Sequence, residues 1–142
     1  MSTNLTATIQ ITVHASSSRV WAAMTEPHLV KKYMMGADVK TDWKVGSPLI
    51  YTGEYQGKAY EEKGTILQIQ PGKLLQATHF SASSGKEDKP ENYSVVTWKL
   101  HGEDGATVVT VSQDNIATEK GVEGSKANRK TVLEGLKKTA EE

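Results

Sequence analysis

Apolar and polar residues alternate near the start of the chain and then switch to a helical spacing. Residues 7–13 follow the two-residue period of a half-buried strand. The serines at 16–18 offer hydroxyl caps for a helix that carries Val20, Trp21 and Met24 on one side. The opening therefore predicts a strand followed by a short helix.

A proline then divides this helical region into two. Pro27 stops the first helix and can begin a second, because proline fits the first turn of a helix but not its interior. Leu29, Val30 and Tyr33 give the second helix an apolar face. We expect two short helices in succession.

From residue 37 onward, short apolar runs are separated by turn signals. Gly46, the pair 56–57 and the pair 71–72 mark turns at spacings typical of antiparallel meanders. The runs between and after these turns predict strands over residues 49–55, 59–69, 74–80, 93–101 and 106–112. Residues 82–92 are polar and predict an exposed, mobile loop.

The C-terminal segment has one apolar stripe at three- and four-residue steps, formed by Arg129, Val132, Leu133, Leu136 and Ala140. Gly121 and Gly124 each lower helix propensity by about 1 kcal/mol. The helix is therefore predicted to begin at Ser125, with residues 113–124 as a loop.

The order of these elements indicates the fold class. A strand, two short helices, a series of strands and one long helix cannot form a parallel doubly wound sheet. The order predicts a single α+β domain over residues 1–142. Its bent antiparallel sheet of six or seven strands wraps around the long C-terminal helix.

Composition excludes several classes of function. The 17 basic and 17 acidic residues cancel, so there is no net basic field of the kind that binds nucleic acid. The absence of cysteine removes disulfides, thiolate nucleophiles and cysteine-based zinc sites. No signal peptide and no membrane-spanning apolar run is found, so we expect a cytoplasmic protein with no membrane partner. No motif for a cofactor or metal is found, and none is predicted.

Several motifs resemble one family. The opening ITVHASSSRVWAAMTEPHLVKKYM is similar to the start of SRPBCC (START-like, helix-grip) proteins, in particular the branch of activators of the heat-shock-protein-90 ATPase. Trp43-Lys44-Val45-Gly46, residues 64–67, residues 71–75 with Thr78, and the closing NRKTVLEGLKKTAEE extend the likeness over nearly the whole chain. The resemblance implies a helix-grip fold with a cavity between the sheet and the last helix.

The candidate site residues are those expected to face this implied cavity. Aromatic, methionine and leucine side chains would give it apolar walls with a few polar tips, as ligand pockets usually have. The predicted set is Tyr33, Met35, Trp43, Tyr51, His79, Phe80, Trp98, Arg129 and Leu133.

Two members of this set depart from the family pattern. Arg129 stands where many relatives have a tryptophan, and His79 where many have an aromatic residue. His79 is either a core histidine bonded to backbone or water, or a ligand contact. Arg129 lies at the edge of its stripe, or points into the cavity. In the cavity it needs an acid such as Glu54 or Glu62, or an anionic ligand.

The sequence leaves three functions open. The favoured one is a non-catalytic protein that binds a small apolar or aromatic molecule, which can be anionic. The second is a co-chaperone module that acts on a heat-shock-protein-90-type chaperone. The third is a START-like cyclase or hydratase, for which His79 with Tyr51 or Tyr55 are the best acid–base candidates.

Overall fold

The computed structural model describes residues 5–34, 36–55, 57–81, 86–103 and 105–142. The elements in chain order are β1 (Leu5–Val13), α1 (Ser17–Thr25), α2 (Pro27–Tyr33), β2 (Asp38–Lys40), β3 (Pro48–Tyr55), β4 (Lys58–Gln70), β5 (Leu74–Ser81), the 3₁₀ turn η2 (Pro90–Asn92), β6 (Ser94–Glu103), β7 (Ala106–Ile116) and α3 (Glu119–Glu141).

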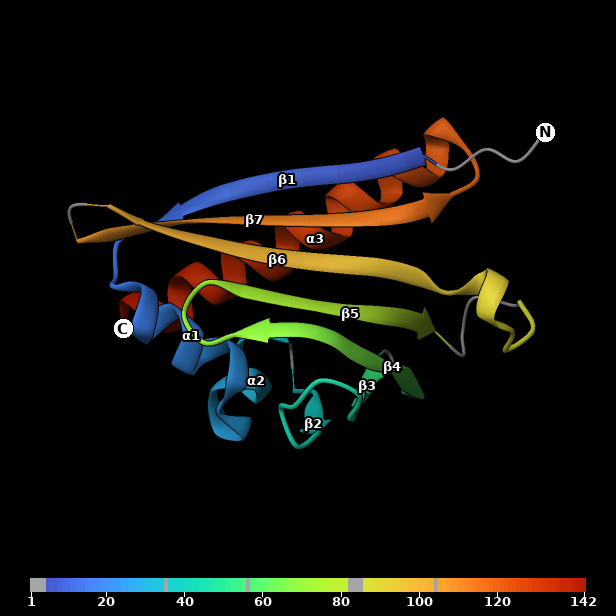
Figure 1. Ribbon diagram of the computed structural model, residues 1–142, viewed down its shortest axis with the longest axis horizontal. Coiled ribbons are helices and arrows are strands. Elements are labelled where there is room, and N and C mark those ends of the chain that lie inside the picture. Colours follow the sequence, from blue (N-terminus) through green and yellow to red (C-terminus); the bar gives the residue numbers. More distant parts are fainter. Residues whose placement is uncertain (1–4, 35, 56, 82–85, 104) are drawn as a thin grey trace.

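The strands form one antiparallel sheet of seven, in the order β1-β7-β6-β5-β4-β3-β2. Figure 1 shows α3 lying along one face of this sheet, with α1 and α2 beside its C-terminal end. The predicted α+β helix-grip fold is therefore confirmed. None of the described helices combines the length and the apolar character that crossing a membrane would need.

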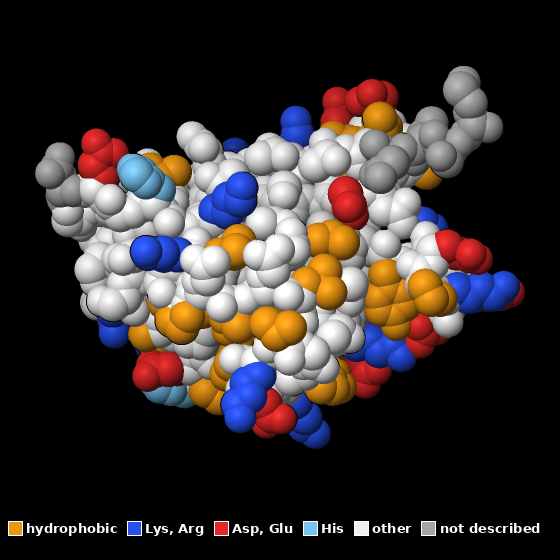
Figure 2. Space-filling view, in the orientation of Figure 1, with side chains coloured by type: hydrophobic (Ala, Val, Ile, Leu, Met, Phe, Trp, Pro, Cys, Tyr) orange, Lys and Arg blue, Asp and Glu red, His pale blue; other side chains and the backbone are white. Residues whose placement is uncertain are grey.

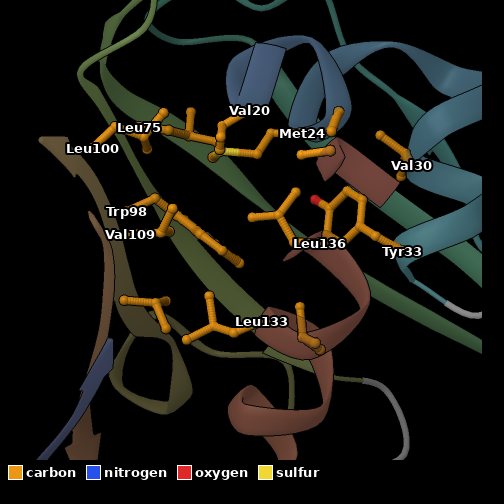
Figure 3. Packing of buried hydrophobic residues seen from close by; sticks show 14 of the residues in the cluster. Val20, Met24, Val30, Tyr33, Leu75, Trp98, Leu100, Val109, Leu133 and Leu136 are labelled. Carbon is orange, nitrogen blue, oxygen red and sulfur yellow. The ribbon is translucent and has the colours of Figure 1, made fainter. Parts of the chain in front are cut away.

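The core lies between the concave face of the sheet and the three helices. Period-two alternation turns Val109 and Val111 of β7 toward α3, and their strand neighbours toward the outer face. Figure 3 shows Leu136 of α3 between Trp98 of the sheet and Tyr33 of α2, with Leu133 beside them. The outer face shows mainly neutral polar groups and backbone, with small apolar patches and scattered charges (Figure 2).

The helix starts are fixed by hydroxyl caps and by proline. The Ser16 hydroxyl accepts a hydrogen bond from the Arg19 N–H at 3.2 Å, and Pro27 opens α2. The Thr118 hydroxyl accepts from the N–H of Gly121 at 3.0 Å and so begins α3 at Glu119. The two hydroxyl caps pair N–H groups that a first helical turn leaves unpaired, and Pro27 has no N–H to pair.

The predicted loop over residues 113–124 is wrong. β7 continues to Ile116 and α3 begins at Glu119, six residues before the expected start at Ser125. Val122 is buried with Ala7 and Ile116, and this tertiary packing offsets the weak helix propensity of the two glycines. Gly121 is also favoured sterically, because an added Cβ would lie 2.8 Å from the Ile116 side chain.

Two smaller differences concern the middle of the chain. The three-residue strand β2 was not predicted, since nothing in so short a segment has a measurable period. Of the predicted loop at 82–92, residues 82–85 lie outside the described residues, and η2 occupies its last three positions.

The backbones of the paired strands β4 and β5 approach very closely at Gly64. A Cβ added to Gly64 would lie 1.7 Å from the carbonyl oxygen of Thr78, so only glycine permits this approach. The Thr78 hydroxyl accepts a hydrogen bond from the Thr65 N–H at 2.8 Å, in place of a backbone partner.

The close approach of Gly64 to Thr78 gives the first prediction. Gly64→Ala is expected to lower the free energy of unfolding by roughly 1–3 kcal/mol or more, because the strands must separate to admit the methyl group. Gly124→Ala is the matched control: nothing lies within 4 Å of its added Cβ, and it should stabilise α3 by roughly 0.5–1 kcal/mol. Urea unfolding of both variants measures the difference. Equal effects would contradict the close approach.

Candidate functional site

A row of polar side chains crosses the concave face of the sheet, opposite the middle of α3. The inward positions that are apolar elsewhere are taken here by Tyr51 of β3, Glu62 of β4, His79 of β5, Ser94 of β6 and Gln113 of β7. Gln113, for example, continues the inward phase of Thr107, Val109 and Val111. Each of these five strands thus contributes one polar side chain to the same layer.

A small cavity of about 40 Å³ lies within this layer. It is lined by Met34, Leu49, Tyr51, Glu62, Lys63, Leu75, Ala77, Thr78, His79, Val96, Trp98 and Arg129. One water needs roughly 10–15 Å³ on this measure, so about three waters, or a group of three heavy atoms, would fill it. The walls are apolar on one side and carry ionisable groups on the other.

Arg129 is the buried charge of this site. It is 8% exposed, and its guanidinium reaches the cavity from the middle of α3. The Nη2 group donates to the Gln113 side-chain oxygen at 3.4 Å, while Nε has no hydrogen-bond partner. A buried donor left without a partner costs roughly 1–3 kcal/mol.

Glu62 and His79 form a close pair beside this guanidinium. Their side chains are hydrogen-bonded at 2.6 Å, between Glu62 Oε1 and His79 Nε2. The pKa of Glu62 is lowered, first by this hydrogen bond and then by the charges of His79 and Arg129, with burial opposing them. An ionised carboxylate can only accept, so Nε2 carries the proton of the pair.

Neighbouring ionisable groups shift the pKa of Arg129 without forming a direct ion pair with it. Burial lowers the pKa of Arg129, while the charge of Glu62 and then Tyr51 and Tyr33 act to raise it. A guanidinium nevertheless keeps its charge at any pH that proteins tolerate. The salt bridges among the described residues do not include Arg129 with Glu62. The charge is therefore balanced nearby but not directly paired.

Two tyrosines close the opposite end of the cluster. The hydroxyl groups of Tyr33 and Tyr51 are hydrogen-bonded to each other. Burial raises the pKa of both phenols, so both stay neutral at physiological pH. They offer polar tips without adding charge.

A surface cleft lies next to the cavity, and His79 lines both. The cleft has a volume of about 310 Å³ and runs between the β5, β6 and β7 ends and the first turns of α3. Gln113 and Ser125 stand on its wall: the Ser125 hydroxyl donates to the Gln113 side-chain oxygen at 2.8 Å. Gln113 Nε2 in turn donates to Ser94 Oγ at 3.3 Å.

The structure brings together some of the predicted site residues. Tyr51, His79, Trp98 and Arg129 line the cavity. Tyr33 is buried behind Tyr51.

The other predicted residues lie elsewhere. Leu133 is in the core, where Figure 3 shows it facing the sheet. Phe80 stacks on Tyr93 with ring centroids 5.1 Å apart and lines the outer cleft. Trp43 is half-buried in the β2–β3 connection with φ 55°, and packs against the core. Met35 lies outside the described residues.

Sequence reasoning missed Gln113 and Ser125. Gln113 fell in the segment predicted as a loop, and Ser125 was predicted only as the start of the last helix, so neither was placed at the site. Extending the two-residue phase of β7 by one step would have placed Gln113 inward. Of the two acids considered for Arg129, Glu62 lines the cavity and Glu54 is exposed.

A larger open cleft of about 660 Å³ lies between α1 and the turns at Gly72 and Gly102. Its polar lining residues, such as Ser17 and Lys73, are exposed or half-buried. Perturbed, buried ionisable groups mark functional sites more often than open polar surface does. Within the described parts of the chain, no three His, Asp or Glu side chains gather as metal ligands would.

Comparison with known proteins supports the resemblance. A family model described as "Activator of Hsp90 ATPase homolog 1-like protein" matches residues 14–141. The solution structure of ChR145 from Cytophaga hutchinsonii is 46% identical over 94% of this chain and 92% of its own, with a TM-score of 0.81. No curated protein matches the sequence.

More distant structures share the fold alone. CV1439 from Chromobacterium violaceum is 19% identical, over 96% of this chain and 97% of its own, with a TM-score of 0.81. The Aha1 dimer from Colwellia psychrerythraea is 18% identical, over 96% of each chain, with a TM-score of 0.73.

The Glu62–His79 pair predicts a pH-dependent contribution to stability. Because the folded-state pKa of Glu62 is lowered, its contribution is present above the unfolded-state value and is lost as pH falls through the folded-state value. Glu62→Gln should therefore cost roughly 1.5–3 kcal/mol near neutral pH, and the difference from the parent should vanish in acid. Urea unfolding across pH measures it. Glu61→Gln, at an exposed neighbour, is the control, and a cost that does not vary with pH would contradict the pairing.

Replacing Arg129 should stabilise the protein, whereas replacing Glu62 should destabilise it. Arg129→Met removes a buried charge and an unpaired donor and keeps a long apolar stem. The free energy of unfolding should rise by about 1 kcal/mol. If Arg129 were instead held in a tight ion pair, the same change would cost about 3–5 kcal/mol. Lys130→Met, at the exposed neighbouring position, should change stability by less than about 0.5 kcal/mol.

Proposed function

The chain belongs to the family of Activator of Hsp90 ATPase homolog 1-like proteins, and on that premise we propose that it binds a small, largely apolar molecule between the sheet and α3. Membership points, as a class, to ligand-binding or polyketide-cyclase-like proteins. The proposal narrows this class to binding at the layer that holds Arg129.

The observation that carries the proposal is an ionisable cluster buried in an apolar core. Met34, Leu75, Val96 and Trp98 form apolar walls around the cavity, and Arg129 reaches into it with Nε unpaired. A core built only for stability would place an apolar residue at that position of α3. Apolar walls with a few convergent polar groups are the usual make-up of a ligand pocket.

The size of the cavity limits how the ligand can sit. Ligand pockets commonly span roughly 300–1,000 Å³. The inner cavity of about 40 Å³ would hold only one end of such a molecule. The adjoining cleft of about 310 Å³ is large enough for the remainder. We expect side-chain rotations at His79 and Gln113 to join the two on binding.

A second candidate, a cyclase- or hydratase-like enzyme, is supported by one specific observation. His79 is oriented by Glu62 and lines the cavity together with Tyr51. A histidine held by a carboxylate is the common arrangement of a general base. Turnover that disappears in His79→Gln, while ligand affinity is kept, would favour this function over binding alone.

Ligand binding is tested by NMR titration with neutral aromatic and lipid-like metabolites. Perturbed amides should cluster at Ala77, Val96 and Trp98 on the concave face. Ala77→Leu fills the cavity and should weaken binding at least tenfold, at an overpacking cost of roughly 1–3 kcal/mol that unfolding curves will report. Lys99→Leu, on the outer face of β6, should bind as the parent does.

Val96→Leu, which adds a single methylene to the cavity wall, keeps the test valid if Ala77→Leu fails to fold. Perturbations confined to the outer sheet face would contradict the proposal. A stimulated chaperone ATPase without any ligand would favour the co-chaperone alternative, which is supported by the family description alone.

A further inference from the structure

Arg129 holds a charge whose present partner is a neutral amide at long range. Its Nη2 reaches Gln113 Oε1 at 3.4 Å, and that oxygen already accepts from Ser125 at 2.8 Å. Nε, which is buried as well, has no partner. The guanidinium edge formed by Nε and Nη2 therefore lacks an anion that matches it.

We propose that the ligand of this site carries a carboxylate, which binds the Nε and Nη2 edge of Arg129 and displaces the Gln113 side-chain oxygen. This inference rests on the proposed function and names the class of its ligand. In the protein without ligand, the Gln113 side-chain oxygen accepts one hydrogen bond from Arg129. The ligand carboxylate is a stronger acceptor and replaces it.

A carboxylate fits this edge better than other anions. Arginine and carboxylate are both planar, and two parallel N–H···O bonds form between them. The cavity has room for about three heavy atoms, the number in a carboxylate group. A phosphate is larger and carries up to two charges, so its desolvation in this apolar layer would cost more.

The outer cleft indicates the shape of the rest of the ligand. It begins at His79 and Gln113 and continues past Phe80 and Ile116, so its floor is partly apolar. Gln113 stands on the wall of this cleft and bonds Arg129 at its inner end. A molecule with a terminal carboxylate and an aryl or alkyl body would lie along this line, with its charged end inward.

The charges already present in this layer are balanced or paired without the ligand. The titratable groups facing this layer are Tyr33 from α2, Tyr51 from β3, Glu62 and Lys63 from β4, His79 from β5 and Arg129 from α3. The Lys63 ammonium is already paired with Asp88 at the surface. Glu62 and Arg129 offset each other, so a ligand carboxylate adds one negative charge to this layer.

The test compares two nearly isosteric probes, 4-phenylbutyrate and the neutral 4-phenylbutanamide, by NMR titration or calorimetry. The parent protein should bind the carboxylate at least tenfold more tightly than the amide. Arg129→Met should remove the preference, so that the two probes bind this variant with equal affinity. Arg129→Lys, which keeps the charge but loses the planar fork, should restore only part of it.

Two further variants separate local pairing from general charge. Lys130→Met removes the same charge at the next, exposed position of α3 and should keep the preference. Gln113→Ala removes the competing acceptor and should increase the preference for the carboxylate over the amide severalfold.

The remaining outcomes count against the inference in distinct ways. Equal affinity of the two probes, with perturbed amides in the cavity, overturns the carboxylate assignment and leaves the proposed function standing. A preference that survives Arg129→Met overturns the role of Arg129. If neither probe nor any neutral metabolite binds the parent, the proposed function falls, and the inference with it.

Discussion

The burial of one guanidinium between a sheet and a helix is the constraint on which this site depends. Arg129 stands on the apolar stripe of α3, where Val132, Leu133 and Leu136 pack against the concave face. A charge in that position requires polar groups opposite it. The strands supply them in a single layer, from Tyr51 across to Gln113. The cavity is the space that this layer leaves.

Two close backbone approaches hold that layer in position. Gly64 lets β4 approach Thr78 of β5 closely, beside the hydrogen-bonded pair Glu62 and His79. Gly135 lets α3 approach α2, since a Cβ there would lie 2.8 Å from the carbonyl oxygen of Tyr33. Both contacts require a missing side chain and not an unusual backbone angle. They bring β4 against β5 and α3 against α2, the elements that carry Glu62, His79 and Arg129.

Much of this arrangement could be predicted from the sequence, because the fold depends on the spacing of apolar residues and on the positions of proline and glycine. Alternation in residues 7–13, the Pro27 break and the stripe on α3 indicated the helix-grip order correctly. The start of α3 could not be predicted from propensity: burial of Val122 and the Thr118 cap outweigh Gly121 and Gly124. That error also concealed Gln113. The unusual Arg129 was visible in sequence, but its orphaned Nε is a property of three-dimensional packing.

The most direct test of the central claim is the NMR signal of the Arg129 Nε–Hε group in the protein without ligand. A guanidinium enclosed between sheet and helix should show an Hε that exchanges with water far more slowly than in a fully solvated arginine side chain. Its proton resonance should move downfield when a carboxylate ligand binds, and should not move with the neutral amide. Exchange as fast as that of an exposed arginine, with no response to either ligand, would contradict the buried and unpaired charge.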